Sequence, residues 1–482
     1  MLKTDVLIIG AGAVGTAIAR ELSKFNLGVL VVDQKDDIGG DSSKASSSCI
    51  STESTIEPHT LESMICQNSR PMFEQLCAEL EIPFKRCGSI TPAVNPEQFE
   101  KIPGMLKRAF ENGVYDVEFR TREELLAMEP CLNPEVLGGV YSPRDAQINQ
   151  FMLVVAQAEN AAENGVEFLL DCKVLDMEID NGAIERIITS KGEIYASYVV
   201  NAAGLYCDQI EKMTGECQFS VHSRKGQFYL LDKNTAVRVK HTIMSIPLPN
   251  TRGKLIIPTV DGNILVGPTA EDMLDKTDKK TTFEGLEEVE REAKMLIPGL
   301  RMEDTITQFV GLRPAREPEG YHIEVSKRVR GYVSLSGIRS SGLTGSLGIA
   351  KYTVQMMRED GLELVRKNHF IAKRKGIVSF ADASDEERDG LIANDPLYGH
   401  VVCRCETITE SEIVQAIHRP VGARTVDGVK RRVRAGMGRC QGGFCGPQVI
   451  AILARELKIP VQEIRKRDGK SYMLDRTYCP IK

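Results

Sequence analysis

Three glycines near the start of the chain constrain its fold more than any other feature. Val6–Ile9 reads as a short buried strand, and the glycines follow it as Gly10-x-Gly12-x-x-Gly15. From residue 14 to residue 22, apolar side chains then recur at the spacing of one helix face. Glycines in such a strand–turn–helix unit allow a tight turn, close approach of the backbone to a pyrophosphate, and close packing of helix on strand. The unit therefore predicts a dinucleotide site in an α/β domain.

A second predicted strand supplies a contact for the ribose. Residues 28–32 are apolar apart from the first glycine, and Asp33 follows them directly. A carboxylate at this place can accept hydrogen bonds from ribose hydroxyl groups, which favours FAD or NAD over NADP. The whole unit of strand, glycines, helix, strand and acid is much more specific than the glycine spacing alone.

Two further segments are rich in small residues. Residues 39–48 consist of Gly, Ser, Asp, Lys and Ala, so they form either a flexible loop or a backbone threaded against a flat ring. Residues 332–352 predict a strand, a Gly/Ser turn and a helix built from small residues. The N-terminus of such a helix can stabilise negative charge on a reduced ring. Both segments favour FAD.

At residues 4–358 the chain resembles the D-amino-acid-oxidase-like superfamily of FAD oxidoreductases. Within the superfamily it is most similar to the large subunit of anaerobic glycerol-3-phosphate dehydrogenases. Besides the N-terminal unit, the motifs that carry the resemblance are Val199–Asp208, Arg224–Asp232, Pro258-Thr259, Gly262-Asn263, Val266–Asp272, Gly311–Arg316 and Gly342–Thr344.

The resemblance implies an α/β fold with a Rossmann-like FAD-binding domain and a mixed-sheet substrate domain. Strand-like runs at 166–170, 173–179, 184–189, 194–200, 219–231 and 254–257, a hairpin turn at Asn181-Gly182 and a helical stretch at 286–296 agree with it. The expected boundaries are 1–80, 145–215 and 310–365 for the FAD-binding domain, 81–144 and 216–309 for the substrate domain, 366–398 for a linker, 399–467 for a small helical domain and 468–482 for a tail. The implied FAD-binding residues are Gly10, Gly12, Gly15, Asp33, Ser43, Lys44, Ala45, Ser47, Val174, Ala203, Gly204, Gly337, Ser341, Gly342, Leu343 and Thr344.

Four cysteines near the C-terminus form a second motif. Cys403 and Cys405 are followed by Cys440 and Cys445, and such pairs are more typical of metal ligands than of buried thiols. Four thiolates suit either zinc or an iron–sulfur cluster. The pattern is similar to the [2Fe-2S] domain of bacterioferritin-associated ferredoxins, which also ends the glycerol-3-phosphate dehydrogenase large chain. Thr409 and Glu412 predict a capping box at the start of a helix in this domain.

The charge distribution points to the same module. The chain of 482 residues has a net charge of −6, yet residues 403–467 contain 13 Lys/Arg and 6 Asp/Glu. We expect this basic segment to offset the charge of the cluster, and the run at 430–439 to be either solvated or a docking face for an electron acceptor. It lacks the interleaved aromatic residues that binding of nucleic acid would favour. No apolar run is long enough to span a membrane, and no leader pattern is apparent. We therefore expect a cytoplasmic protein, with membrane association only through a partner subunit.

Candidate catalytic residues come partly from the resemblance. Arg313 corresponds to the arginine that grips a substrate carboxylate or phosphate in the superfamily, a role suited to a planar cation. Arg339 is either a second anion ligand or a charge beside the flavin. The candidate bases are His59, His222 and Lys225, although a lone histidine is more often structural.

The implied reaction is hydride transfer from a small anionic substrate to FAD, with electrons leaving singly through the cluster to a partner protein in a hetero-oligomer. Glycerol-3-phosphate enzymes carry a histidine shortly after the small-residue loop, whereas this chain has Cys49–Thr52 there. The substrate is therefore either glycerol 3-phosphate, or a 2-hydroxy acid or N-substituted amino acid. A third alternative is an electron-transfer subunit with a degenerate pocket.

Overall fold

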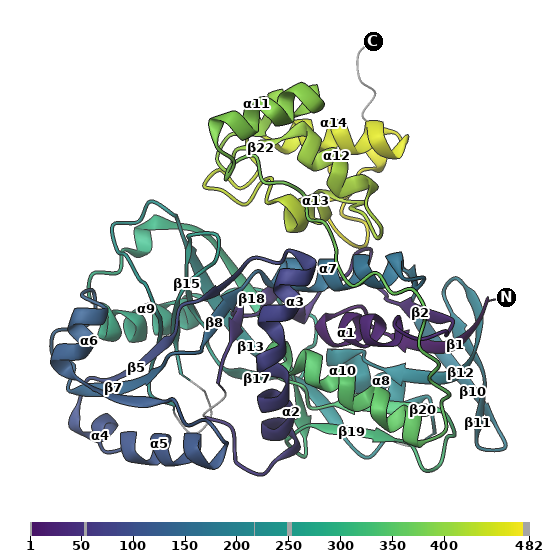
Figure 1. Ribbon diagram of the computed structural model, residues 1–482, viewed down its shortest axis with the longest axis horizontal. Coiled ribbons are helices and arrows are strands. Elements are labelled where there is room, and N and C mark those ends of the chain that lie inside the picture. The colour runs from purple at the N-terminus through teal and green to yellow at the C-terminus, as the bar shows by residue number, and fades with distance from the viewer. Residues whose placement is uncertain (1, 53–54, 216, 248–252, 476–482) are drawn as a thin grey trace.

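The computed structural model describes residues 2–52, 55–215, 217–247 and 253–475, and it contains two large sheets and a separate C-terminal module (Figure 1). The two sheets lie side by side in one body. The module lies over α7 (Gln150–Glu163) and is joined to the body by one long segment that runs past α1 (Ala13–Leu22; Figure 1). No helix among the described residues is both long and apolar enough to cross a bilayer.

The first sheet carries the glycine-rich unit. Its central strands β12, β1, β2 and β9 are parallel, and β20 extends it beside β12, also in parallel. The eight strands are β1 (Leu2–Ile9), β2 (Val29–Val32), β9 (Glu167–Leu169), β10 (Val174–Asp180), β11 (Ala183–Thr189), β12 (Gly192–Asn201), β19 (His322–Val325) and β20 (Tyr332–Ser336). The predicted hairpin is confirmed, because β10 and β11 are antiparallel and Asn181 and Gly182 both have positive φ.

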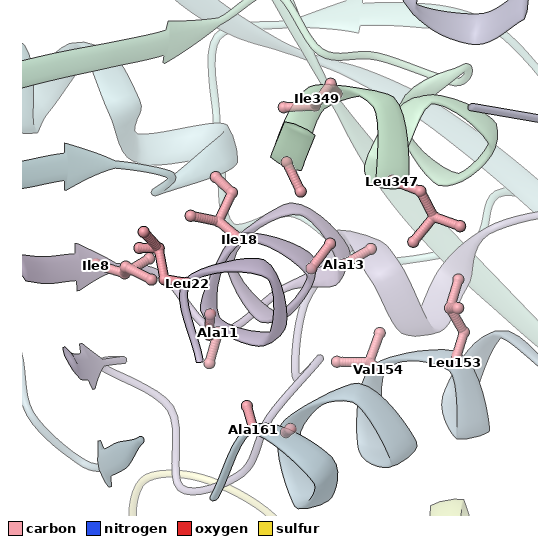
Figure 2. Packing of buried hydrophobic residues seen from close by; sticks show 14 of the residues in the cluster. Ile8, Ala11, Ala13, Ile18, Leu22, Leu153, Val154, Ala161, Leu347 and Ile349 are labelled. Carbon is pink, nitrogen blue, oxygen red and sulfur yellow. The ribbon is translucent and has the colours of Figure 1, made fainter. Parts of the chain in front are cut away.

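The hydrophobic core of this half is built around α1 (Ala13–Leu22). Helix α1 is rich in alanine and packs between α7 (Gln150–Glu163) and α10 (Gly342–Glu359). Ile18 and Leu22 are fully buried, and Figure 2 shows them with Leu347 and Val154 around the helix. Small residues on α1 let both neighbours approach closely, which fixes where the N-termini of α1 and α10 lie.

The second sheet is mixed and has nine strands. β13 pairs with β18 in antiparallel fashion along its whole length. The strands are β5 (Ser89–Ala93), β6 (Glu118–Thr121), β7 (Gly138–Ser142), β13 (Ser220–Leu231), β14 (Thr242–Met244), β15 (Leu255–Pro258), β16 (Ile264–Gly267), β17 (Glu271–Met273) and β18 (Thr305–Glu317). Strand β18 crosses the domain boundary proposed at residue 310, because the residues on both sides of it pair with β13.

The remaining elements of the body surround the sheets. A small sheet joins β3 (Cys49–Ile50), β8 (Ala146–Ile148) and β4 (Phe84–Arg86). The other helices are α2 (Leu61–Ser69), α3 (Phe73–Leu80), α4 (Pro96–Phe99), α5 (Ile102–Glu111), α6 (Arg122–Met128), α8 (Cys207–Lys212) and α9 (Phe283–Leu296), with the short 3-10 helices η1 (Ser42–Ala45), η2 (Arg70–Met72), η3 (Gly204–Tyr206) and η4 (Met302–Asp304). The helical prediction for 286–296 is thus confirmed.

The C-terminal module has its own hydrophobic core. It contains α11 (Asp385–Asn394), η5 (Pro396–Gly399), β21 (Val401–Cys403), β22 (Ile408–Thr409), α12 (Glu410–His418), α13 (Val426–Val433), α14 (Gly446–Leu457) and η6 (Val461–Glu463). The capping box of Thr409 and Glu412 is confirmed at the start of α12.

The segment expected to be a linker divides into two parts. The first part lies on the body: the N–H of Lys367 donates to the carbonyl of Lys24, and the N–H of Arg374 donates to that of Glu79. The second part forms α11, which begins at its own capping box on Ser384 and contacts η5 of the module. Its polar, charged composition concealed the helix, because a mostly exposed helix needs no apolar stripe.

Candidate active site and cysteine centre

The glycine-rich turn connects β1 to α1 in a backbone shape that side chains would block. Gly10 has a φ of 111°, and a Cβ there would lie 2.4 Å from the carbonyl oxygen of Ala202. A Cβ on Gly15 would lie 1.9 Å from the carbonyl oxygen of Gly10. The turn can therefore approach a ligand closely, and the N-terminus of α1 presents its N–H groups beside it.

Asp33 lies at the end of β2 against this turn. Its Oδ2 accepts a hydrogen bond from the N–H of Ala11 at 2.7 Å, and its Oδ1 accepts one from the N–H of Lys35 at 2.8 Å. Burial raises the pKa of Asp33 to about 6. Each carboxylate oxygen retains a lone pair for a ribose hydroxyl group, so the residue fits the role expected from the sequence.

The serine-rich segment folds back onto the same helix end. The Ser43 hydroxyl accepts a hydrogen bond from the N–H of Ala13 at 3.0 Å, and the Ser42 hydroxyl donates to the carbonyl of Leu312 at 2.7 Å. Burial, together with the charges of Arg431 and Lys279, lowers the pKa of Lys44 to about 8. Lys44 is half-buried, and a cation in this segment suits a pyrophosphate. The segment is thus a short 3-10 helix and ordered turns rather than a flexible loop.

One cavity extends from this turn to the second sheet. Among the residues predicted to bind FAD or substrate, those that line it are Gly12, Ser43, Ala45, Ser47, Gly204, Arg313, Gly337, Arg339, Gly342 and Leu343. The other predicted residues lie next to this lining. The segments beside the cavity contain Gly10, Gly15, Asp33 and Lys44. Ala203 precedes Gly204, and Ser341 and Thr344 lie at the start of α10, close to the cavity. Val174 is buried and begins β10, two residues after Cys172, whose N–H donates to the carbonyl of Asp33. The cavity therefore has the surroundings that FAD requires.

Arg313 is a fixed cation in the cavity wall. Its guanidinium donates to the carbonyl oxygens of Thr269 at 2.6 Å, Arg224 at 3.2 Å and Lys225 at 3.3 Å. Arg339 also lines the cavity, and its Nη1 lies 2.8 Å from Oε1 of Glu319. The predicted anion-binding residues are thus brought to one cavity.

The three candidate bases are not brought to it. His59 is exposed, Nε2 of His222 lies 3.2 Å from Oδ1 of Asp272, and Nζ of Lys225 lies 3.2 Å from Oδ2 of Asp278. None of the three lines the cavity as the described residues define it. His222 and Lys225 are on β13 and turn to carboxylates at or beyond β17, although His222 precedes the Arg224–Asp232 motif and Lys225 lies within it.

Sequence reasoning missed Asp145, which also lines the cavity. Its Oδ1 accepts a hydrogen bond from the N–H of Thr52 at 2.5 Å, and its Oδ2 accepts one from the Ser89 hydroxyl at 2.6 Å. Asp145 thus holds the segment that follows β3 against the second sheet. Cys49 lines the cavity as well, and burial raises the pKa of its thiol to about 12, so it is a poor proton acceptor.

The four cysteines of the module come together as two pairs. Cys403 and Cys445 are almost fully buried, whereas Cys405 and Cys440 are exposed. A hydrogen bond from the Cys445 thiol, with N–H groups of Gly436 and Glu406, lowers the pKa of Cys403 to about 6. The N–H of Phe444 and a hydrogen bond with Cys405 lower the pKa of Cys440. Backbone donors around thiolates also help to set the reduction potential of an iron–sulfur cluster.

The two metal alternatives need the same ligands. Four thiolates suit zinc as well as an iron–sulfur cluster, so the cysteine pairs agree with both.

The basic residues of the module have a different role from the expected one. Arg432 donates two hydrogen bonds of 2.8 Å to the carboxylate of Asp37, and Arg431 donates a third at 2.6 Å. All three side chains are buried. Arg434 binds Glu406 within the module and Asp261 of the body. The interpretation of this run as an exposed docking face is wrong for these arginines, because they hold the module on the body.

Comparisons with known proteins agree with both sites. The family model "FAD dependent oxidoreductase" (DAO) matches residues 5–356, and "BFD-like [2Fe-2S] binding domain" matches residues 401–455. A glycerol 3-phosphate dehydrogenase of Caloramator mitchellensis is 42% identical, with 98% of each chain covered. One subunit of the anaerobic glycerol-3-phosphate dehydrogenase of Haemophilus influenzae is 23% identical over 96% of this chain and 86% of its own length.

A solved structure is similar to the body of the protein. The L-α-glycerophosphate oxidase of Mycoplasma pneumoniae with FAD bound has a TM-score of 0.73 and 25% identity, and covers 77% of this chain and 98% of its own. The similarity thus extends over both sheets and the cavity between them.

Proposed function

Because the chain belongs to the DAO family of FAD-dependent oxidoreductases and ends in a BFD-like [2Fe-2S] domain, we propose that it oxidises glycerol 3-phosphate and passes the electrons to a partner protein. FAD and the [2Fe-2S] cluster are its cofactors. The observation that carries the proposal is the relative of 42% identity, a glycerol 3-phosphate dehydrogenase, because its similarity spans both cofactor domains. Residues Cys49–Thr52 lack the histidine that glycerol-3-phosphate enzymes carry there. A 2-hydroxy acid and an N-substituted amino acid are therefore the competing substrates.

The residues divide the work between two cofactor sites. The glycine-rich turn, Asp33 and Ser43 hold the dinucleotide, and Arg313 binds the anionic group of the substrate. FAD, when bound, accepts a hydride from a carbon–hydrogen bond of the substrate. The four cysteines hold a cluster that carries single electrons, which explains why a two-electron and a one-electron group share one chain.

Anaerobic mixing of the FAD-loaded protein with a substrate panel tests the proposal. We expect glycerol 3-phosphate to bleach the flavin absorbance near 450 nm, and glycerol, which lacks the anionic group, to bleach it far more slowly. The panel includes a 2-hydroxy acid and N-methylglycine. Rapid bleaching by one of these, without bleaching by glycerol 3-phosphate, would reject the proposed substrate.

Substitution of Arg313 tests the position of the substrate. A hydrogen bond to a charged group contributes about 1.5–3 kcal/mol, so Arg313→Ala is expected to raise KM for glycerol 3-phosphate roughly 10- to 100-fold. Steady-state kinetics measure the change. Arg313→Lys should recover only part of it, because an ammonium group cannot replace a planar fork.

The control for this variant is FAD content, since Arg313 also holds three backbone carbonyl groups. If Arg313→Ala retains FAD and its KM is unchanged, the substrate does not bind at this wall of the cavity.

A further inference from the structure

A buried carboxylate lies at the start of α10, the helix whose first residues line the cavity. Glu62, in the first turn of α2, is 6% exposed, and its Oε1 accepts a hydrogen bond from the Ser341 hydroxyl at 2.5 Å. Ser341 is the N-cap residue of α10 and is fully buried. Its hydroxyl also lies 2.8 Å from that of Tyr321. Ser341 therefore links Glu62 directly to the N-terminus of α10.

Two helix N-termini meet at this carboxylate. Helix α2 begins after Thr60, whose hydroxyl accepts a hydrogen bond from the N–H of Ser63, and Glu62 lies in that first turn. Helix α10 is 18 residues long and begins at Ser341. Helix N-termini carry partial positive charge and stabilise anions. Glu62 therefore supplies, from within the protein, a negative charge to the helix end that faces the cavity.

This arrangement affects the flavin. The residues that line the cavity at this end are Gly337, Ile338, Arg339, Ser340, Gly342 and Leu343. A helix N-terminus at this place stabilises the negative charge that a flavin gains on reduction. A fixed carboxylate at the same helix end opposes that stabilisation.

We propose that Glu62 is a positioning residue that acts through Ser341 to weaken the stabilisation of reduced flavin by α10, and so makes the flavin a better electron donor. The proposal rests on FAD binding and is independent of the identity of the substrate. Such tuning suits a chain in which electrons have to leave the flavin for a second centre, because a flavin whose reduced state is stabilised too strongly would retain the electrons.

Sulfite titration of the FAD-loaded full chain tests the proposal without any substrate. Sulfite adds to oxidised flavin and places negative charge on its ring, so its affinity reports how well the site stabilises that charge. Loss of one charge in the protein interior changes such an equilibrium by about tenfold. We therefore expect Glu62→Gln to bind sulfite about tenfold more tightly, as measured by loss of flavin absorbance.

A redox titration provides a second readout. A tenfold change corresponds to about 30 mV for a two-electron couple, and the flavin potential of Glu62→Gln should become more positive. The matched control is Glu57→Gln, which removes an exposed carboxylate five residues earlier in the chain. Its sulfite affinity and potential should equal those of the wild type.

Two further variants separate charge from shape. Glu62→Asp keeps the charge and should stay near the wild-type sulfite affinity, whereas Glu62→Met removes both charge and polarity and should follow Glu62→Gln. Unchanged sulfite affinity in an FAD-loaded neutral variant would overturn the proposal. Loss of FAD from both neutral variants would also overturn it, since Glu62 would then have a structural role only.

Discussion

Replacement of Cys403 by alanine is expected to remove the [2Fe-2S] cluster and to lower turnover with an external one-electron acceptor by more than about 1000-fold. Cys403 is buried, and its sulfur is hydrogen-bonded to that of Cys445. With one of four thiolates missing, the iron on that side lacks a protein ligand. Alanine is preferable to serine, because a hydroxyl group could still ligate iron. Iron content, visible absorption and EPR of the anaerobic protein measure the loss.

Flavin reduction by substrate should survive in this variant, because the cavity lies in the body and Cys403 in the module. Stopped-flow measurement of flavin absorbance distinguishes this half-reaction from turnover. The matched control is Cys172→Ala, which removes a buried cysteine of the body that has no partner cysteine nearby in the chain. Undiminished turnover in a Cys403 variant that lacks the cluster would mean that electrons leave directly from the flavin.

Substitution of Asp37 is expected to loosen the module from the body. Removing one partner from a buried, hydrogen-bonded ion pair is destabilising by about 3–5 kcal/mol, and Asp37→Asn leaves both Arg431 and Arg432 without an anion. Urea denaturation should show an earlier transition for the module, and limited proteolysis should become faster between residues 366 and 384. Asp468→Asn removes a more exposed ion pair of the same interface, with Lys35, and should change stability by less than about 1 kcal/mol.

The pH dependence of this contact has a definite sign. Burial opposes ionisation of Asp37, but the charges of Arg432 and Arg431 outweigh it and lower its pKa to about 2. A carboxylate with a lowered pKa contributes stability above its unfolded pKa, which is about 3.9, and that stability is lost as the pH falls toward 2. Equal acid sensitivity of the wild type and Asp37→Asn between these values would show that the pair does not stabilise the interface.

The local pattern of the sequence was enough to predict the parts of the fold that depend on neighbouring residues. The turn after β1, Asp33 at the end of β2 and the Asn181-Gly182 hairpin each follow from a few consecutive side chains. The four cysteines were equally visible, because thiolate ligands leave a spacing in the sequence.

What the sequence did not reveal depends on residues that are far apart in the chain. Asp37 meets Arg432 across 395 positions and Glu62 meets Ser341 across 279. Neither acid belongs to a motif, and only the packing of complete helices brings the partners together. The partners of His222 and Lys225 were hidden in the same way, because β13 directs both side chains to carboxylates about 50 positions later in the chain.

The segment between the body and the module has a kinetic consequence. Arg374 of this segment and Arg419 of the module both donate to the carboxylate of Glu159 on α7, and Arg374 and Glu159 are completely buried. Redox domains on flexible tethers deliver electrons by swinging between donor and acceptor, so that each turnover includes a diffusive search. A module fastened at Glu159 and at Asp37 makes no such excursion. If electrons pass from the flavin to the cluster as proposed, the fold fixes the distance between the two cofactors, and we expect tunnelling distance and driving force to set the rate of transfer.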